Sequence, residues 1–499
     1  MASFLLSECL EKIFSNFIDE RPFSDVGSNI STRNLYSCTL VSRHWCRIST
    51  PVLYSYPFHH FRHKTSYNAF YKLIRTLLSC VPQSEIKKIF FNKLNELIHI
   101  PYITNILPTF NYISLIRGLI VDELMFKSQY LIIYKEIWLS AYNPKMMSTE
   151  VIIQIMNHFV KFLCKNSNNF TILEFPFTMQ NNDIINLLTI KDCHGKSKLS
   201  DLKEFYYINS YFNRDNRDEE IKLLPKGLYL TLSNNVYNLK LLYNKRIKTI
   251  DEAKSLSQFI SAQKRLQHII LSENRYDLLF YSLDRLFYSN ADNKYNIVFN
   301  SLSTQSESLQ ILEFKNLYFG DINQNVVNSL CLLRNIRELK LYKCRKINDN
   351  LYPWAKNLTK LEVFELVERY YTNISEEFLI QLIQSSSNTL TKLVINYERV
   401  EKQGVRLFQQ IPLYLNLLIY LELPKIFPNE LISILKSCNR LVYFSVILSD
   451  DGLVEENLRN LEECVIGGCV LKYLEINGCD NFHEYVDVTK QFGVQLVKM

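Results

Sequence analysis

Glycine is the residue that this sequence most clearly lacks. Only 11 of its 499 residues are glycine, roughly a third of what the average usage of about 7% would give. Phosphate-binding loops and turn-dense β-sandwiches both depend on glycine, and the chain has neither a Walker-type loop nor a Gly-x-Gly-x-x-Gly pattern. We therefore expect no nucleotide-binding loop and no sandwich of short strands.

Long apolar runs are also missing. No stretch approaches the length of about 18 uninterrupted apolar residues that a membrane helix needs. The N-terminus carries Glu8 and Glu11 and has no basic segment of the kind that opens a secretory signal. The 12 cysteines are scattered among apolar residues, which favours reduced, buried thiols over disulfides. These features predict a cytoplasmic or nuclear protein without a membrane partner.

Residue patterns that indicate catalysis or metal binding are sparse. His59, His60 and His63 have no fourth ligand nearby and lie in a basic stretch that would repel a cation. Cys193-His194 is an isolated pair in a polar segment. We therefore predict a protein that is not an enzyme, with no catalytic residue, no metal site and no cofactor.

The charge distribution argues against a nucleic-acid binder. The net charge of +7 is modest for this length, and Lys and Arg are interleaved with Asp and Glu almost throughout. A nucleic-acid-binding protein concentrates its basic residues instead. We interpret the most basic stretch, residues 59–64, as a solvated linker. A nucleic-acid or phospholipid patch over residues 59–75 is the alternative.

What the chain does contain, first, is an apolar helical segment at its N-terminus. Apolar residues recur at three- and four-residue steps and so share one helix face at Leu6, Leu10, Ile13, Phe14 and Phe17. Ser7 is expected to cap this helix. The same spacing returns at Leu35, Cys38, Val41, Trp45 and Ile48, where Pro51 is expected to end the helix. So small a packet cannot bury its apolar surface alone, and it needs the rest of the chain or a partner.

These residues resemble the F-box. The family pattern begins Leu-Pro-x-Glu-x-Leu-x-x-Ile-Phe-x-x-Leu, and its counterparts here are Leu5, Leu6, Glu8, Leu10, Ile13, Phe14 and Phe17. Its second half resembles Leu-x-x-Cys-x-x-Val-x-x-x-Trp, with counterparts at Leu35, Cys38, Val41 and Trp45. Leu6 stands where the family has proline, and residues 19–33 form a longer insert than usual.

The resemblance implies binding to a Skp-type adaptor and, through it, to a cullin. It assigns to the adaptor-binding face, or to the support of that face, Leu5, Leu10, Ile13, Leu35, Val41 and Trp45. Trp45 is equally suited to holding the helices together. An ordinary helical cap on a larger domain is the alternative interpretation of this segment.

From about residue 80 the sequence repeats a short motif, apolar-x-x-apolar-x-apolar, mostly at intervals of 23 to 34 residues. Clear copies begin at Leu309, Ile336, Leu361, Leu390, Leu418, Leu441 and Leu471, and weaker ones at Ile86, Phe170, Leu202, Val236 and Leu266. The last two apolar residues alternate as in a half-buried strand, and the segments between copies have helical spacing, as in the one that Ser375 can cap. One strand and one helix per repeat predicts a leucine-rich-repeat solenoid.

The sequence thus predicts an α/β chain: an N-terminal helical F-box followed by an irregular leucine-rich-repeat solenoid, with parallel strands on the concave side and helices on the convex side. The predicted parts are the F-box-like module 1–55, a linker helix 56–80, the degenerate solenoid 81–480 and a C-terminal cap 481–499. Residues 117–165 and 275–308 lack the motif, and extra or diverged helical segments are expected there. Leucine-rich repeats favour Asn or Cys at the position eight residues after the first apolar residue of each motif. The residues that meet this preference are Asn244, Asn274, Cys344 and Cys479.

In such a solenoid the residue between the last two motif positions points out of the sheet. From residue 170 onward these residues are Glu174, Tyr206, Lys240, Ile270, Glu313, Lys340, Glu365, Val394, Glu422, Ser445 and Glu475. This acidic row would repel phosphate backbones and suits a protein segment of basic or mixed character, unless the charges merely keep the sheet face soluble. With nearby tyrosines, the candidate substrate-binding residues are Tyr206, Glu313, Lys340, Glu365, Tyr420, Glu422, Tyr443, Tyr473 and Glu475.

The sequence therefore favours the substrate-recognition subunit of a Skp–cullin–F-box ubiquitin ligase that captures an unknown protein substrate. A leucine-rich-repeat interaction scaffold without a ligase role is the first alternative. A nucleic-acid or phospholipid binder is the second.

Overall fold

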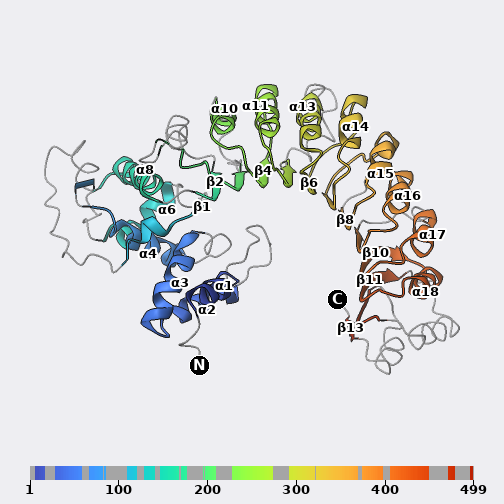
Figure 1. The fold of residues 1–499 in the computed structure, drawn as a ribbon, viewed down its shortest axis with the longest axis horizontal. Coiled ribbons are helices and arrows are strands. Elements are labelled where there is room, and N and C mark those ends of the chain that lie inside the picture. The colour runs from blue at the N-terminus through green and yellow to red at the C-terminus, as the bar shows by residue number, and fades with distance from the viewer. Residues whose placement is uncertain are drawn as a thin grey trace. The chain divides into compact units, whose positions relative to one another are not determined.

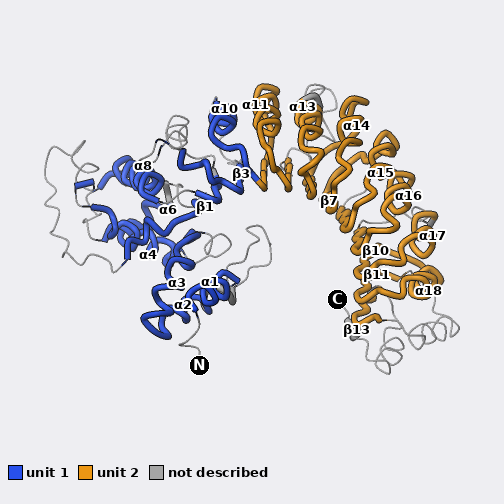
Figure 2. The backbone as a smooth tube through the Cα atoms, in the orientation of Figure 1, with its two compact units in different colours: residues 1–239 blue, residues 240–499 orange. Residues whose placement is uncertain are grey.

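The computed structural model describes residues 6–16, 29–58, 67–82, 84–85, 110–120, 128–140, 147–167, 170–176, 191, 195, 197–208, 227–273, 292–320, 322–368, 374–396, 405–448, 470–477 and 495–497. The chain forms two compact units, residues 1–239 and 240–499 (Figure 2). The boundary between them lies inside the segment that the sequence predicted as one solenoid. Both units combine helices with parallel strands, so the fold is α/β.

Unit 1 begins with three helices, α1 (Ser7–Ser15), α2 (Asn29–Thr39) and α3 (Arg43–Ser55) (Figure 1). Their shared core consists of the buried side chains of Leu10, Phe14, Leu35 and Val52. The helical spacing of these residues in the sequence explains why they face one another.

Two local predictions in these helices were wrong. Leu6, and not Ser7, is the N-cap of α1, because its carbonyl already accepts the Leu10 amide at 3.1 Å. Pro51 does not end α3, which continues to Ser55. Proline removes one backbone hydrogen bond, but the burial of Val52 in the shared core stabilises the last turn.

The rest of unit 1 carries three parallel strands that pair in chain order, β1 (Gly118–Ile120), β2 (Ile172–Pro176) and β3 (Glu204–Ile208). The described helices around them are α4 (Tyr67–Leu78), η3 (Tyr112–Leu115), α6 (Ser128–Ile133), α7 (Lys135–Trp138), α8 (Thr149–Asn166) and α10 (Leu228–Ser233). β1 lies in a region where we expected no motif. The buried Ile116, just before the strand, and the buried Leu119 within it nevertheless form, with Val121, a complete copy of the motif in the sequence.

In unit 2 the strands pair in parallel, each beside the next along the chain: β4 (Leu241–Lys245), β5 (His268–Ser272), β6 (Ile311–Lys315), β7 (Glu338–Tyr342), β8 (Val363–Val367), β9 (Lys392–Asn396), β10 (Tyr420–Ile426), β11 (Tyr443–Leu448), β12 (Tyr473–Asn477) and β13 (Gln495–Val497). The described helices are α11 (Ile250–Ser261), α13 (Asp292–Leu302), η7 (Ser303–Gln305), α14 (Gln324–Cys331), η8 (Asp349–Leu351), α15 (Tyr352–Asn357), α16 (Glu376–Ser385), α17 (Val405–Tyr414) and α18 (Pro428–Ser437). The longer of these helices lie on one side of the sheet (Figure 1). None of the described helices is long and apolar enough to span a membrane.

The motif spacing explains the core of unit 2. Its second position forms a continuous row of fully buried side chains across the sheet, at Leu242, Ile269, Leu312, Leu339, Phe364, Leu393, Leu421, Phe444 and Leu474. Ser375 caps α16 as predicted, because its hydroxyl accepts the Phe378 amide at 3.1 Å. The repeated strand and helix are therefore packed as the sequence predicted from Leu266 onward.

The predicted frame was wrong at β4. The motif there is Leu239-Leu242-Asn244, so Tyr243 lies opposite Ile270 and Lys240 precedes the strand. Leu241 and Leu242 are adjacent apolar residues that allow two frames in the sequence, and pairing with β5 selects one of them.

With the shifted frame, Asn244 no longer lies eight residues after the first apolar residue of the motif, the position at which such repeats favour Asn or Cys. Cys344 does occupy that position, and its Sγ lies 3.3 Å from the Phe314 carbonyl oxygen in the interior. The motif at Ile86, the predicted helix near Leu278, and the positions of Asn274 and Cys479 lie outside the described residues.

Candidate binding surfaces

The first candidate surface consists of exposed apolar side chains on the N-terminal helices. Of the residues that the sequence assigned to adaptor binding, Ile13 is 42% exposed and Val41 is 60% exposed. Three more large apolar side chains on or beside these helices are exposed, those of Leu6, Tyr36 and Leu40. The sequence did not single out Tyr36 and Leu40, because neither belongs to the apolar face that forms the core.

The remaining assigned residues lie behind this surface. Leu10 and Leu35 are fully buried. Trp45 packs against the same core, with its ring 5.3 Å from that of Phe14 in an edge-on arrangement. Its amide also donates to the Ser42 hydroxyl at 3.1 Å, which caps α3. These side chains hold the helices together. Leu5 lies outside the described residues.

The end of α3 is attached to the start of the unit 1 sheet. The Arg117 amide donates to the Ser55 carbonyl at 2.9 Å, one residue before β1. The Tyr56 hydroxyl lies 3.1 Å from the Thr171 hydroxyl, one residue before β2. The Tyr56 ring occupies the space where a side chain at Gly118 would lie, since a Cβ there would be 2.4 Å from its Cδ1. Glycine at position 118 therefore lets α3 approach the sheet.

The second candidate surface is the side of the unit 2 sheet opposite its described helices, which we call the helix-free face. Its central row runs in register through Tyr243, Ile270, Glu313, Lys340, Glu365, Val394, Glu422, Ser445 and Glu475. A second row, the tyrosine row, lies two residues earlier on the last strands, at Lys392, Tyr420, Tyr443 and Tyr473. Of the candidate substrate-binding residues, Tyr206 alone belongs to unit 1. It is buried there, and its hydroxyl donates to the Glu204 carboxylate at 2.6 Å.

Neighbouring basic side chains stabilise the ionised glutamates of β6 and β8. Glu313 is buried, which opposes its ionisation, but His268 at 3.7 Å and Lys315 at 2.7 Å outweigh burial and lower the pKa of Glu313 to about 2. Burial likewise opposes the charge of Glu365. Its contacts with Lys392, at 2.7 Å, and with the Tyr342 hydroxyl nevertheless lower the pKa of that carboxyl. This part of the face is electrically balanced.

The tyrosine row is a stack of rings beside carboxylates. The rings of Tyr420 and Tyr443 are parallel within 6° with centroids 4.3 Å apart. The Tyr443 hydroxyl donates to the Glu475 carboxylate. The pKa of Tyr443 is raised mainly by burial and, in second place, by this hydrogen bond. Glu422 accepts a hydrogen bond from the Asn396 amide at 2.8 Å. The face therefore offers aromatic rings and anionic oxygens together.

Sequence reasoning missed His268, Lys315 and Lys392, the partners of Glu313 and Glu365. Each lies two residues before or after a central-row residue, so period-two alternation places it on the same face. The same alternation that predicts the central row therefore also predicts these three residues on the face.

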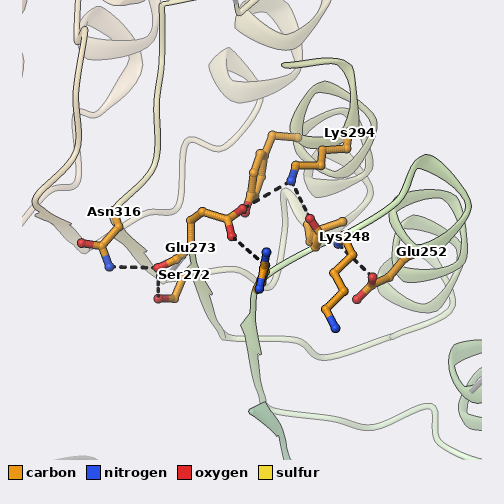
Figure 3. Close-up of polar contacts among 9 residues, drawn as sticks. Lys248, Glu252, Ser272, Glu273, Lys294 and Asn316 are labelled. Atoms are coloured by element: carbon orange, nitrogen blue, oxygen red, sulfur yellow. Dashed lines mark hydrogen bonds and ion pairs between the residues drawn. The ribbon is translucent and has the colours of Figure 1, made fainter. Parts of the chain in front are cut away.

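A buried polar cluster lies at the end of β5 (Figure 3). The Glu273 carboxylate accepts the Tyr295 hydroxyl at 2.6 Å and lies 3.4 Å from Lys294 Nζ and 3.7 Å from Arg246 Nε. The backbone carbonyl of Glu273 accepts a hydrogen bond from the side-chain amide of Asn316 at 3.0 Å. These contacts connect α13 to the loops after β4 and β6, so the cluster serves the fold.

Glu252, beside this cluster, lies in the first turn of α11, whose N-cap is Thr249. Its carboxylate accepts the Lys248 amide at 2.9 Å, while the Thr249 hydroxyl accepts the Glu252 amide at 3.1 Å. Burial raises the pKa of Glu252 to about 7. These two bonds engage the Thr249 hydroxyl and Oε2 of Glu252, whereas the buried Oε1 of Glu252 has no hydrogen-bond partner among the described residues.

Comparison with known proteins gave no assignment: neither a scan against protein-family models nor a search of curated proteins found a match. Among the residues that the structure describes, no group of three or more His, Cys, Asp or Glu could hold a metal ion. The histidines at 59, 60 and 63 and the pair at 193 and 194 lie outside those residues.

Proposed function

We propose that this chain is the substrate receptor of a Skp–cullin–F-box ubiquitin ligase. In this proposal the N-terminal helices bind a Skp-type adaptor, and the helix-free face of unit 2 captures a protein substrate. The observation that carries the proposal is the exposure of Ile13 and Val41 on the N-terminal helices. The core of these helices is already formed by other side chains, among them Leu10 and Leu35. An apolar surface that the chain's own core does not need is suited to a partner.

The receptor performs no bond chemistry in this scheme. It binds substrate and adaptor at once, so that the substrate experiences a high local concentration of the ubiquitin-loaded enzyme. The attachment of α3 to β1 and β2 through Ser55 and Tyr56 supports this role, because it fixes the helices on the sheet of unit 1.

Co-expression of the full chain with a Skp-type adaptor tests the proposal. We expect the two to copurify, and we expect Ile13→Asp or Val41→Asp to abolish copurification. Burying either aliphatic side chain contributes about 1.5 kcal/mol or more, whereas a carboxylate buried in its place without a partner costs several kcal/mol. Substitution of Leu10 or Leu35 would be uninformative, since these residues form the core.

Leu413→Asp is the matched control, because Leu413 is an exposed leucine on α17 of unit 2. It should leave copurification unchanged. Failure of the wild-type chain to bind the adaptor would refute the ligase role. A chain that captures a protein through unit 2 without binding the adaptor would instead be an interaction scaffold.

A further inference from the structure

Two lysines of the helix-free face each lie between a tyrosine ring and a carboxylate. Lys392 Nζ is 2.7 Å from Glu365 Oε1 and 4.8 Å from the ring centroid of Tyr420. Lys315 Nζ is 2.7 Å from Glu313 and 5.5 Å from the ring centroid of Tyr342. A ring face and a carboxylate both attract a cation. The face thus holds a cationic side chain twice with the same two groups, a tyrosine ring and a carboxylate. In both cases the cation is a lysine of the chain itself.

The same two groups recur on β12 without such a lysine. Tyr473 lies in register between Tyr443 on β11 and Gln495 on β13, whereas Tyr420 lies between Tyr443 and Lys392. Tyr473 is 43% exposed. Within the described part of the chain, neither Tyr473 nor Glu475 contacts a lysine or arginine, and the Tyr443 hydroxyl is the partner of the Glu475 carboxylate.

The charges of this end of the face are complementary to a basic partner. Glu422 and Glu475 both lie in the central row, and their described hydrogen-bond partners, Asn396 and Tyr443, are neutral. Glu475 is also buried, where an uncompensated carboxylate attracts a cation more strongly than it would in water. An acidic or phosphorylated segment would be repelled here.

We propose that Tyr473 and Glu475 bind the lysine or arginine side chain of a basic segment of the captured protein, as Tyr420 and Glu365 bind Lys392. Tyr443 positions the carboxylate through its hydroxyl. This inference rests on the proposed function insofar as unit 2 captures a protein, and it names the chemistry of what is captured.

Fluorescence anisotropy of the full chain with a fluorescein-labelled Arg-Ser repeat peptide tests the inference, with a Glu-Ser peptide of the same length as the negative probe. We expect the Arg-Ser peptide to bind and the Glu-Ser peptide not to bind. Tyr473→Leu keeps the apolar bulk but removes the ring face, and should weaken binding about threefold, the size expected of an exposed cation–ring contact. Glu475→Gln should weaken binding at least as much, because it removes the charge.

A substitution on β13 provides the sharper test. Gln495 is paired in register with Tyr473, as Lys392 is with Tyr420. The lysine introduced by Gln495→Lys should compete with the peptide and block its binding. Gln495→Met is the uncharged control and should bind the peptide as the wild type does.

Three results would overturn the inference: no binding of the Arg-Ser peptide to the wild type, equal binding of the Glu-Ser peptide, or equal binding by the wild type and Gln495→Lys. Copurification with the adaptor distinguishes this failure from failure of the ligase role. Tyr473→Leu should still bind the adaptor, and Ile13→Asp should still bind the peptide.

Discussion

Single charged residues decide the character of the helix-free face. Glu313 and Glu365 are carboxylates in a partly buried row, where an uncompensated charge would be costly. Each is instead held by a lysine of the same face, Lys315 and Lys392. Lysines of the chain itself therefore pair with the carboxylates in the middle of the face, whereas Glu422 and Glu475 on its last strands contact the neutral Asn396 and Tyr443.

The lowered pKa of Glu313 predicts a stability that depends on pH. Because the folded chain lowers this pKa to about 2, the stabilisation is present above the unfolded pKa near 4.5 and is lost as the pH falls toward 2. Glu313→Gln should lower the free energy of unfolding at pH 7 by on the order of 2 kcal/mol. Urea denaturation at a series of pH values should show this difference shrink below about pH 4.5.

Glu362→Gln is the control for that measurement. Glu362 pairs with Arg337 at 3.1 Å, but both side chains are about half exposed, so its loss should change stability by less than about 0.5 kcal/mol at any pH. A Glu313→Gln effect that did not change with pH would mean that packing, and not ionisation, makes Glu313 stabilising.

Alternation along the strands predicted which residues lie on the helix-free face but not how they pair. Glu313, Lys340, Glu365, Glu422 and Glu475 lie in one row as the sequence predicted. The contact of Lys392 with Glu365 joins β9 to β8, and it depends on the register between strands that are far apart in sequence. The spacing within one motif contains no information on that register.

At the scale of elements, the attachment of α3 to the unit 1 sheet joins the N-terminal helices to the rest of that unit. It depends on a short stretch in which Ser55, Tyr56 and Gly118 come together. Motif spacing does not predict this attachment, because its partners lie about 60 residues apart in the sequence.

Gly118→Ala should destabilise unit 1 by about 1–3 kcal/mol, since a Cβ at this position would overlap the Tyr56 ring. Thermal unfolding of the full chain measures the effect. In a Tyr56→Ala background the same glycine substitution should cost much less, because the obstructing ring is gone. An equal cost in both backgrounds would show that backbone conformation, and not the ring, requires glycine.

Repeat spacing predicted the elements of unit 2 well because a parallel sheet buries the same motif positions in every copy. It failed at β4, where Leu241 and Leu242 offer two frames, and at β1, where the motif Ile116-Leu119-Val121 is present in the sequence but was not recognised. The predicted helix end at Pro51, which rested on proline alone, was wrong because the sequence does not show that Val52 is buried beyond it. These failures occur where packing overrides a local pattern.

At the scale of the whole molecule, two surfaces with different chemistry lie on two units. The N-terminal helices of unit 1 expose aliphatic side chains, which suits a stable apolar interface. The last strands of unit 2 present tyrosines and carboxylates, which suits recognition of basic residues. A receptor that connects an adaptor to a substrate requires two surfaces of this kind.

Hydrogen–deuterium exchange of the full chain with and without a Skp-type adaptor tests the central claim most directly. We expect the adaptor to slow exchange in α1 and in the turn around Leu40 and Val41, where the exposed aliphatic residues lie, and to leave β10–β12 unchanged. Unaltered exchange across the N-terminal helices at saturating adaptor would contradict the account.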